Sequence, residues 1–244
     1  MKKSIILLAL VLLLSFTFTI PIKATNGMDL LTSHSNKKMA YLTFDDGPSI
    51  NTIPILNILD EYNIKATFFV MANNSSYAKS GYKEMMKRGH TVALHTYSHD
   101  FSKIYRTKES YFSDLGKLER FLEDHYNLRT KMIRFPGGSK NKSSRQYGSS
   151  HLMRDIIEEL DAKGYTYYDW NIDSKDGISP SISENTIITS VLNGAKNKNI
   201  AVILLHDINS MKNTVRALPD LIEGLKEQGY VFDVISPNIH EFKY

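Results

Sequence analysis

Two short polar motifs, about fifty residues apart, carry side chains that could hold a metal and perform a hydrolysis. The first contains Asp45 and Asp46, and the second begins with His95 and ends with His99. Histidines at this spacing can direct two ring nitrogens at one ion, at about 2.0–2.1 Å, and a carboxylate completes one face. Because neighbouring residues of an extended chain point in opposite directions, one aspartate can bind the metal while the other faces a bound water.

Both motifs follow apolar runs that are typical of β-strands. Ionisable carboxylates at the end of an apolar strand are costly unless a cation or a catalytic task explains them. Chance H-x-x-x-H spacing is the simplest alternative. Another is an iron oxygenase with two histidines and one carboxylate, which would leave the second aspartate without a role and would show iron-dependent oxygen uptake.

The two motifs resemble the first two motifs of the polysaccharide deacetylases, the NodB-homology or carbohydrate esterase family 4 enzymes. Three later stretches resemble the third, fourth and fifth motifs in the family's order: residues 134–138, 169–176 and 204–207. The five motifs extend from about residue 40 to residue 206. The resemblance therefore covers nearly all of the chain after its N-terminal segment.

The resemblance implies a metal site and a general base. Asp46, His95 and His99 would bind a divalent metal, for which zinc is the best match, while cobalt, nickel or iron could also occupy these ligands. Asp45 would take a proton from the bound water. Arg134, near the end of the fourth expected strand, would keep the carboxylate of Asp45 ionised and oriented.

The resemblance also implies a general acid. His206 would protonate the leaving amine, and a carboxylate of the fourth motif would pair with its imidazole and raise its pKa. We expect this partner to be Asp176 rather than Asp173, because the family's aspartate closes the fourth motif.

Substrate contacts are expected around the third, fourth and fifth motifs. Gly137, which follows Pro136, would donate its backbone N–H to the developing oxyanion; the family commonly has tyrosine there, so glycine keeps the donor but lacks an aromatic wall. Gly177 stands where the family often has tryptophan, which would open one side of the groove unless Trp170 compensates. Trp170 fits a sugar-stacking surface and a core position equally well. Leu204, from the fifth motif, completes the expected contacts.

Alternating strand and helix patterns must position these residues. Expected strands are 39–44, 66–70, 91–95, 131–135, 165–170, 200–205 and 230–234, and expected helices are 52–62, 76–88, 108–126, 150–163, 183–198 and 212–228. Such alternation predicts an α/β fold with a parallel sheet, closed or nearly closed into a barrel. The resemblance implies a distorted (β/α) barrel with about seven strands. All five motifs fall at the C-terminal ends of strands, where barrels of this type build their active sites.

The N-terminus is typical of a secretory signal. Residues 1–24 combine a basic start, an apolar stretch and a small residue at the end, which predicts a signal peptide, with an uncleaved anchor as the alternative. Residues 25–38 form a polar linker, and residues 39–244 form one deacetylase-like domain. The chain has no cysteine, which excludes disulfides, thiolate metal sites and a lipid-modified cysteine anchor.

Charge gives no support for nucleic-acid binding. The net charge is +4, but without residues 1–24 the chain has 27 basic and 26 acidic residues. The basic excess therefore belongs mainly to the expected signal. We expect a monomer that contacts a membrane only through an uncleaved N-terminal segment.

The function expected from these residues and the resemblance is metal-dependent removal of N-acetyl groups from a sugar polymer. We expect the protein to be secreted or associated with the cell envelope. The first expected substrate is peptidoglycan N-acetylglucosamine, followed by chitin-like polymers. The alternatives are an O-acetyl esterase on xylan and a non-catalytic glycan-binding domain, which would need a broken site.

Overall fold

The computed structural model describes residues 37–237. The expected signal peptide at residues 1–24 and almost all of the expected linker lie outside this range. Within it, no helix is both long and apolar enough to cross a membrane.

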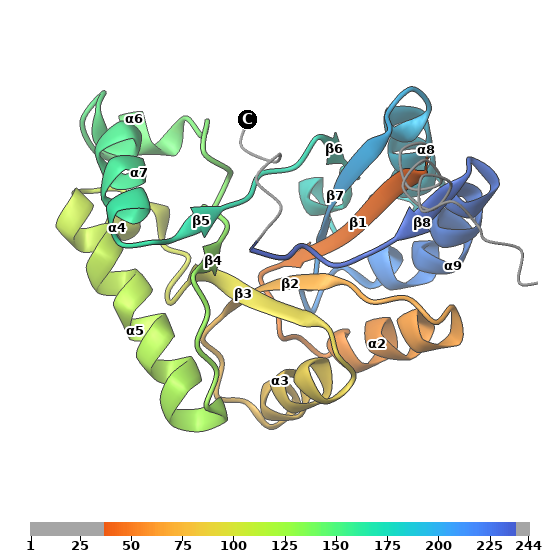
Figure 1. The fold of residues 1–244 in the computed structure, drawn as a ribbon, viewed down its shortest axis with the longest axis horizontal. Coiled ribbons are helices and arrows are strands. Elements are labelled where there is room, and N and C mark those ends of the chain that lie inside the picture. The colour runs from red at the N-terminus through yellow and green to blue at the C-terminus, as the bar shows by residue number, and fades with distance from the viewer. Residues whose placement is uncertain (1–36, 238–244) are drawn as a thin grey trace, which may run out of the picture. The chain divides into compact units, whose positions relative to one another are not determined.

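A curved parallel sheet forms the centre of the described domain (Figure 1). Seven strands are hydrogen-bonded in the order β5-β4-β3-β2-β1-β7-β6, and β8 pairs with β1. The bounds are β1 Lys38–Asp45, β2 Thr67–Met71, β3 Thr91–Thr96, β4 Met132–Ile133, β5 Thr166–Tyr167, β6 Ile172–Asp173, β7 Ile200–His206 and β8 Tyr230–Phe232. All strand pairings among the described residues are parallel, which confirms the predicted α/β class.

Strand β1 is the central element of this sheet. It pairs with β7 along nearly its whole length, from Met39 to Asp45. On its other edge, β8 pairs with its first residues and β2 with its last three, beginning at Thr43. This arrangement places the end of β1 between the ends of β2 and β7. The first motif lies at the end of β1, and the fifth motif lies at the end of β7.

The predicted strand 165–170 is too long, because only Thr166 and Tyr167 form a strand, β5, and the chain then crosses between the two edges of the sheet. β5 and β6 are short edge strands separated by residues 168–171. The crossing segment bonds to both sides: Tyr168 N donates to the Ile133 carbonyl at 2.9 Å and Asn171 N to the Val202 carbonyl at 3.1 Å. Among the described residues no ladder joins β5 to β6, so the chain itself bridges the gap in the barrel.

Helices cover the outer face of the sheet (Figure 1). They are α2 Thr52–Glu61, α3 Ser76–Lys87, α4 Phe101–Ile104, α5 Lys108–Tyr126, α6 Ser143–Tyr147, α7 Leu152–Ala162, α8 Glu184–Ala195 and α9 Lys212–Glu227, with a 3₁₀ turn η1 at Asp176–Ile178. The six long helices match the predicted ones, and glycines with left-handed φ values of 75–85° follow three of them: Gly89, Gly164 and Gly229. The short α4, α6 and η1 lie outside the predicted helices and strands.

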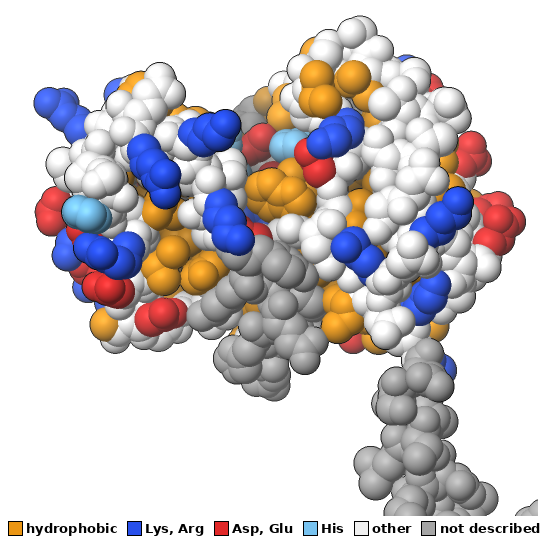
Figure 2. Space-filling view, turned by 90° about the horizontal axis from the view of Figure 1, so that it is seen from above, with side chains coloured by type: hydrophobic (Ala, Val, Ile, Leu, Met, Phe, Trp, Pro, Cys, Tyr) orange, Lys and Arg blue, Asp and Glu red, His pale blue; other side chains and the backbone are white. Residues whose placement is uncertain are grey.

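Alternating strand residues divide the core into two clusters. The larger packs strand residues such as Leu42 and Phe68 against the helices. The smaller contains no helical residue and includes Tyr41, Phe69 and Val202, so it fills the concave side of the sheet. Burying each such side chain contributes roughly 1.5–3 kcal/mol. On one face of the molecule, Lys and Arg side chains are spread around a central hollow, with acidic side chains among them (Figure 2).

Candidate active site

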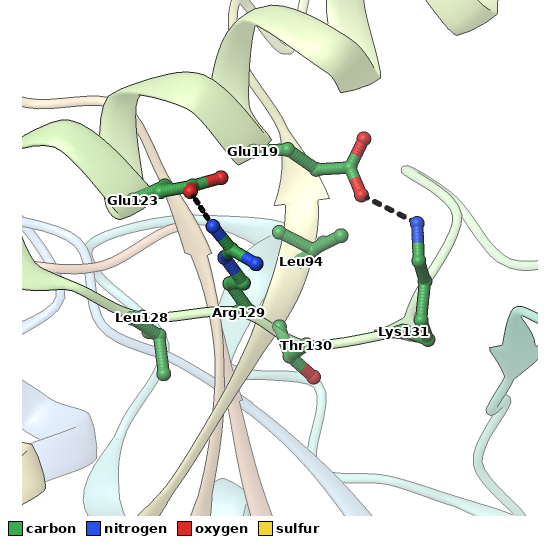
Figure 3. A pocket seen from close by; sticks show the side chains of 7 residues that line it. All are labelled: Leu94, Glu119, Glu123, Leu128, Arg129, Thr130 and Lys131. Atoms are coloured by element: carbon green, nitrogen blue, oxygen red, sulfur yellow. Dashed lines mark hydrogen bonds and ion pairs between the residues drawn. The ribbon is translucent and has the colours of Figure 1, made fainter.

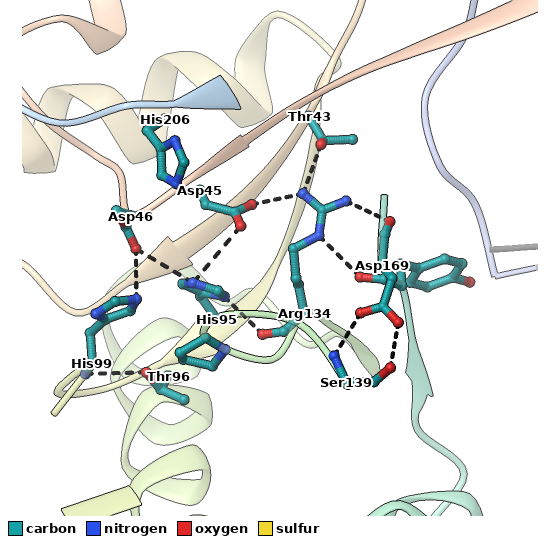
Figure 4. Close-up of polar contacts among 12 residues, drawn as sticks. Thr43, Asp45, Asp46, His95, Thr96, His99, Arg134, Ser139, Asp169 and His206 are labelled. Atoms are coloured by element: carbon teal, nitrogen blue, oxygen red, sulfur yellow. Dashed lines mark hydrogen bonds and ion pairs between the residues drawn. The ribbon is translucent and has the colours of Figure 1, made fainter. Parts of the chain in front are cut away.

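The polar motifs meet at the carboxyl ends of the strands. Asp45 ends β1 and lies in register with His206, which ends β7. His95 lies near the end of β3, and Arg134 directly follows β4. Figure 4 shows these side chains pointing toward one another from different strands. Parallel strands place their C-terminal residues on one rim, so residues far apart in sequence come together.

Asp46, His95 and His99 form one cluster of potential metal ligands. One ligand atom from each lies within 4.8 Å of the others. The Asp46 Oδ1 atom is 3.4 Å from His95 Nε2 and 3.2 Å from His99 Nε2. This oxygen is buried and has no hydrogen-bond partner among the described residues. A buried carboxylate oxygen without a donor is costly, and a cation between these three atoms would satisfy it, so the residues fit a divalent metal.

The imidazole of His95 is held in the form that a metal requires. Its Nδ1 atom is 2.8 Å from the Arg134 carbonyl, which can only accept a hydrogen bond. The proton must therefore be on Nδ1, and the lone pair of Nε2 faces Asp46. Burial lowers the pKa of His95, although the charges of Asp45 and Asp46 oppose this effect. The ring is thus neutral and available as a ligand.

Backbone conformation directs two of the expected ligands. Asp46 and His99 have φ values of 73° and 51°, in the left-handed region that residues with side chains adopt at a cost of about 1–3 kcal/mol. Asp46 N donates to the Phe69 carbonyl at 3.2 Å. The loop of the second motif is fixed by Asp114 of α5, whose Oδ1 accepts from the backbone N–H of Tyr97 at 2.7 Å. The surrounding structure therefore stabilises a strained arrangement.

Asp45 lies between Arg134 and the metal-ligand cluster. Its Oδ1 accepts a hydrogen bond from Arg134 Nη1 at 2.9 Å, and its Oδ2 is 3.9 Å from His95 Nε2. One carboxylate oxygen is thus engaged by the guanidinium, while the other faces the cluster. This is the orientation that a base acting on a water at the cluster would need.

Arg134 is fully buried and connects three strand ends. Its Nε donates to the Tyr168 carbonyl and its Nη2 to the Asp169 carbonyl, both at 3.0 Å. Nη1 also donates to Thr43 Oγ1 at 2.7 Å. The guanidinium stacks near the Phe69 ring at 4.1 Å. Removing this buried, hydrogen-bonded cation would leave Asp45 without its partner.

His206 contacts Asp176, whereas Asp173 lies elsewhere. His206 Nδ1 is 2.7 Å from Asp176 Oδ1, and the backbone N–H of His206 donates to Asp176 Oδ2 at 2.8 Å. Asp173 instead pairs with Lys175 at 2.9 Å. Burial alone would lower the pKa of His206, but the hydrogen bond and charge of Asp176, reinforced by Asp45 and Asp46, raise it to about 9. The imidazolium is therefore favoured and could donate a proton.

The backbone around Gly137 forms a tight turn beside the site. Gly138 N donates to the Phe135 carbonyl at 2.8 Å, and Gly137 has φ of 76°. The Pro136 carbonyl accepts from the Tyr105 hydroxyl at 2.8 Å. No acceptor for the Gly137 N–H occurs among the hydrogen bonds of residues 37–237. This group can therefore serve as a donor to a substrate.

Trp170 and Leu204 differ in exposure. Leu204 is buried beside β6, whereas Trp170 is half-buried and lines a cavity of about 180 Å³ together with Gly137 and Asp169. Trp170 thus contributes both to the interior cluster and to a surface next to the expected oxyanion donor. The space beside Gly177 is filled by His206, because a Cβ there would lie 2.6 Å from Cε1 of the ring. The glycine lets His206 approach the backbone of the fourth motif.

Three further residues, which lie in or next to the motifs and had no predicted role, support the site. Thr43 joins Arg134 to the Ile203 carbonyl. Asp169 accepts from Ser139 N at 2.9 Å and fixes the turn at Gly137. Asp207 accepts from Ser49 and Thr52 hydroxyls at 2.5 Å, and its N–H donates to the Asp45 carbonyl at 2.8 Å. Their positions in or next to the motifs were the signal in the sequence that could have identified them.

Another cavity in the described part of the chain lies away from this site. It has a volume of about 490 Å³ and is lined by α5 and the segment leading into β4 (Figure 3). Two ion pairs, Glu119 with Lys131 and Glu123 with Arg129, span it. It is at the opposite end of β4 from Arg134 and contains none of the expected catalytic residues.

Comparison with known proteins finds a family profile and relatives that match this chain. A family profile described as polysaccharide deacetylase matches residues 32–156. A peptidoglycan-N-acetylglucosamine deacetylase of Bacillus cereus is 33% identical over 84% of this chain and 71% of its own length. A bifunctional xylanase/deacetylase of Pseudobutyrivibrio xylanivorans is 33% identical over 87% of this chain, which spans only 32% of that protein.

A solved structure is similar in both sequence and fold. The catalytic domain of a peptidoglycan N-acetylglucosamine deacetylase from Eubacterium rectale superposes with a TM-score of 0.79 and is 34% identical. The match covers 86% of this chain and 94% of that domain. The similarity therefore extends over most of this chain and nearly all of that domain.

Proposed function

Because this chain belongs to the polysaccharide deacetylase family, we propose that it is a metal-dependent hydrolase that removes N-acetyl groups from a sugar polymer. The observation that carries the proposal is the arrangement of the ligand cluster, Asp45 and His206 on one rim. The Asp46, His95 and His99 cluster lies beside the free oxygen of Asp45, and His206 is the register partner of Asp45. A base, a metal site and an acid therefore face one space.

A divalent metal held by Asp46, His95 and His99 would polarise the acetamide carbonyl and lower the pKa of a water. Asp45 Oδ2 would accept a proton from the attacking water, while Arg134 keeps the carboxylate in place. The Gly137 N–H would stabilise the carbonyl oxygen as it gains negative charge.

His206 would complete the reaction. The water oxygen bonds to the carbonyl carbon, the C–N bond breaks, and the protonated imidazole donates its proton to the amine nitrogen. Asp176 holds the ring through Nδ1, so Nε2 is the donating atom. The products are acetate and a free amine on the sugar.

The proposed substrate is N-acetylglucosamine of peptidoglycan. The proposal is supported by the names of similar proteins, since the Bacillus cereus relative and the Eubacterium rectale domain are both peptidoglycan N-acetylglucosamine deacetylases. The expected signal peptide would place the protein outside the cytoplasm, in the envelope or medium, where this polymer lies. A xylan O-acetyl esterase is the second candidate, because one relative is a bifunctional xylanase/deacetylase.

The test is the release of acetate by the purified protein from peptidoglycan, chitin oligomers and acetylxylan. We expect acetate from an amide substrate and a loss of at least about 10²-fold in Asp45→Asn, which removes the base. Acetate from acetylxylan alone would replace the proposal by the esterase. No acetate from any polymer, with metal bound, would favour a glycan-binding role.

A further inference from the structure

A cavity of about 480 Å³ lies beside α5 and contains none of the expected catalytic residues. Part of its wall comes from Tyr97, in the loop after β3, and from Asn74, in the segment between β2 and α3. The residues of α5 that line it are Lys117, Arg120, Phe121 and His125. Because their spacings of three and four place them on one face of the helix, that face of α5 forms the rest of the wall.

Two cations of this cavity have no acidic partner among residues 37–237. Lys117 and Arg120 are exposed, whereas the ion pairs of α5 in the described part of the chain use Lys108, Glu119 and Glu123. The described residues that line the cavity include no acidic side chain. Like charges three residues apart on a helix repel each other, and an anion between them would offset that repulsion. The cavity therefore favours an anionic ligand.

The acidic residues of this part of α5 leave both cations free. Asp114 Oδ1 accepts from the backbone N–H groups of Tyr97 at 2.7 Å and Ser98 at 3.1 Å, so this buried carboxylate joins α5 to the second-motif loop. Asp124 neither lines the cavity nor forms an ion pair with another described residue. The bonds of Asp114 also fix the cavity wall at Tyr97 before a ligand binds, which lowers the entropy cost of binding.

Aromatic rings supply the uncharged surface of the cavity. Tyr97 is 38% exposed, and its ring meets that of Phe121 edge-on, with the centroids 6.4 Å apart. The ring of His125 lies 4.8 Å from that of Phe121, and its Nδ1 donates to the Phe121 carbonyl at 2.9 Å. Cations beside aromatic rings match a carboxylate carried by a group with C–H faces, such as a short peptide. A neutral sugar would leave both cations without a counter-charge.

The cavity is close enough to the metal-ligand cluster for a branch of the bound polymer to reach it. Tyr97 precedes His99 by two residues, so their Cα atoms are at most about 7 Å apart. Peptidoglycan carries short peptides with free carboxylates, and an extended peptide of about three to five residues spans roughly 10–18 Å. Chitin carries no such branch.

We propose that this cavity binds a carboxylate of a peptide branch of peptidoglycan, with Lys117 and Arg120 as its counter-ions. The inference rests on the proposed function, because the peptide belongs to the strand whose N-acetylglucosamine is deacetylated. It makes the protein selective for peptide-bearing strands over neutral polymers of N-acetylglucosamine.

The variant that tests this is Lys117→Gln/Arg120→Gln, which removes both charges. The matched control is Lys196→Gln/Lys198→Gln, which removes two charges between α8 and the start of β7, at the opposite end of that strand from His206. Acetate release is measured on a peptide-bearing peptidoglycan fragment, on the same fragment with amidated carboxylates, and on the tetramer of N-acetylglucosamine. Loss of two exposed ion pairs should raise KM for the charged fragment about three- to tenfold, with kcat unchanged. KM for the two uncharged substrates should stay at the wild-type value, which also shows that the variant folds.

An unchanged KM for the charged fragment, or an equal rise in KM on the tetramer or in the control variant, would overturn the proposed carboxylate site. Acetate from the neutral tetramer alone would also overturn it. If the wild type releases no acetate from any substrate, the proposed function fails instead. The cavity is then tested by calorimetry of the charged fragment binding to the wild type and to the variant without Lys117 and Arg120. A threefold or larger loss of affinity supports the site, and a smaller loss refutes it.

Discussion

Asp45 and Asp46 are neighbours in the sequence but have different surroundings in the structure. Asp45 continues the strand and meets Arg134, whereas Asp46 turns into the left-handed region and meets His95 and His99. The sequence predicts that the two carboxylates diverge, since extended residues alternate. It cannot predict the left-handed turn of Asp46, because the bond to the Phe69 carbonyl that holds it comes from another strand.

At the scale of residues, His206 and Asp176 should determine how catalytic activity depends on pH. Because Asp176 raises the pKa of His206 to about 9, activity should fall as pH rises through that value and the acid loses its proton. In Asp176→Asn the charge is gone and burial lowers the pKa of His206. The alkaline limb of the pH profile should therefore move to lower pH, with about 10²-fold or greater loss at pH 8.

The control for this prediction is Asp173→Asn, which removes a carboxylate of the same motif that pairs with Lys175 instead. Its pH profile of kcat should match that of the wild type. An alkaline limb that stays in place in Asp176→Asn would contradict the assignment of His206 as the acid.

At the scale of elements, motif positions were easier to predict than short strands. The long strands β1 and β7 follow from continuous apolar runs, and the motifs at their ends are where they were expected. β4, β5 and β6 contain two residues each. They are set by tertiary contacts, such as those of Arg134 with the carbonyls of Tyr168 and Asp169. Local patterns do not contain that information.

His90, at the junction of β2 and β3, should make folding stability sensitive to acid. Its Nδ1 accepts from Ala66 N at 3.1 Å. Burial, then the charge of Lys65, lowers its pKa to about 4, below the value of about 6.5 in an unfolded chain. The folded state therefore binds the proton more weakly. The contribution of His90 to the free energy of unfolding should be fully present above pH 6.5. It should be lost as the pH falls toward 4, by at most about 1.4 kcal/mol per pH unit.

Urea unfolding at pH 7 and pH 4.5 measures this effect. His90→Gln should lose less stability between the two values than the wild type does, although it is less stable at pH 7. His151→Gln, an exposed histidine before α7, is the control. The same acid loss in wild type and His90→Gln would exclude His90 as its source.

At the scale of the whole molecule, the alternation of strands and helices was enough to predict the fold class. Bridging of the sheet edges by residues 168–171 was not predictable, since those residues resemble a strand. A cavity of about 290 Å³ beside Asp46 and His99, which Tyr77 also lines, was not predictable either, because its walls come from loops distant in sequence. Cavities depend on the relative positions of loops, which only the assembled sheet determines.

The expected signal peptide predicts that the chain is cleaved in the cell. Cleavage after Ala24 should release a protein that begins at Thr25. N-terminal sequencing of the protein recovered from the medium and from washed membranes measures this. A full-length chain that stays with the membrane would show that residues 1–24 act as an anchor.

The most direct test of the central claim combines metal content with acetate release. Purified protein is treated with a chelator, reloaded with zinc or cobalt, and assayed on the tetramer of N-acetylglucosamine beside Asp45→Asn and Asp46→Asn. We predict that chelation abolishes acetate release and reloading restores it. Asp45→Asn should retain one metal ion without activity, and Asp46→Asn should lose the ion. Acetate release that survives chelation, or that persists in Asp45→Asn, would contradict the account.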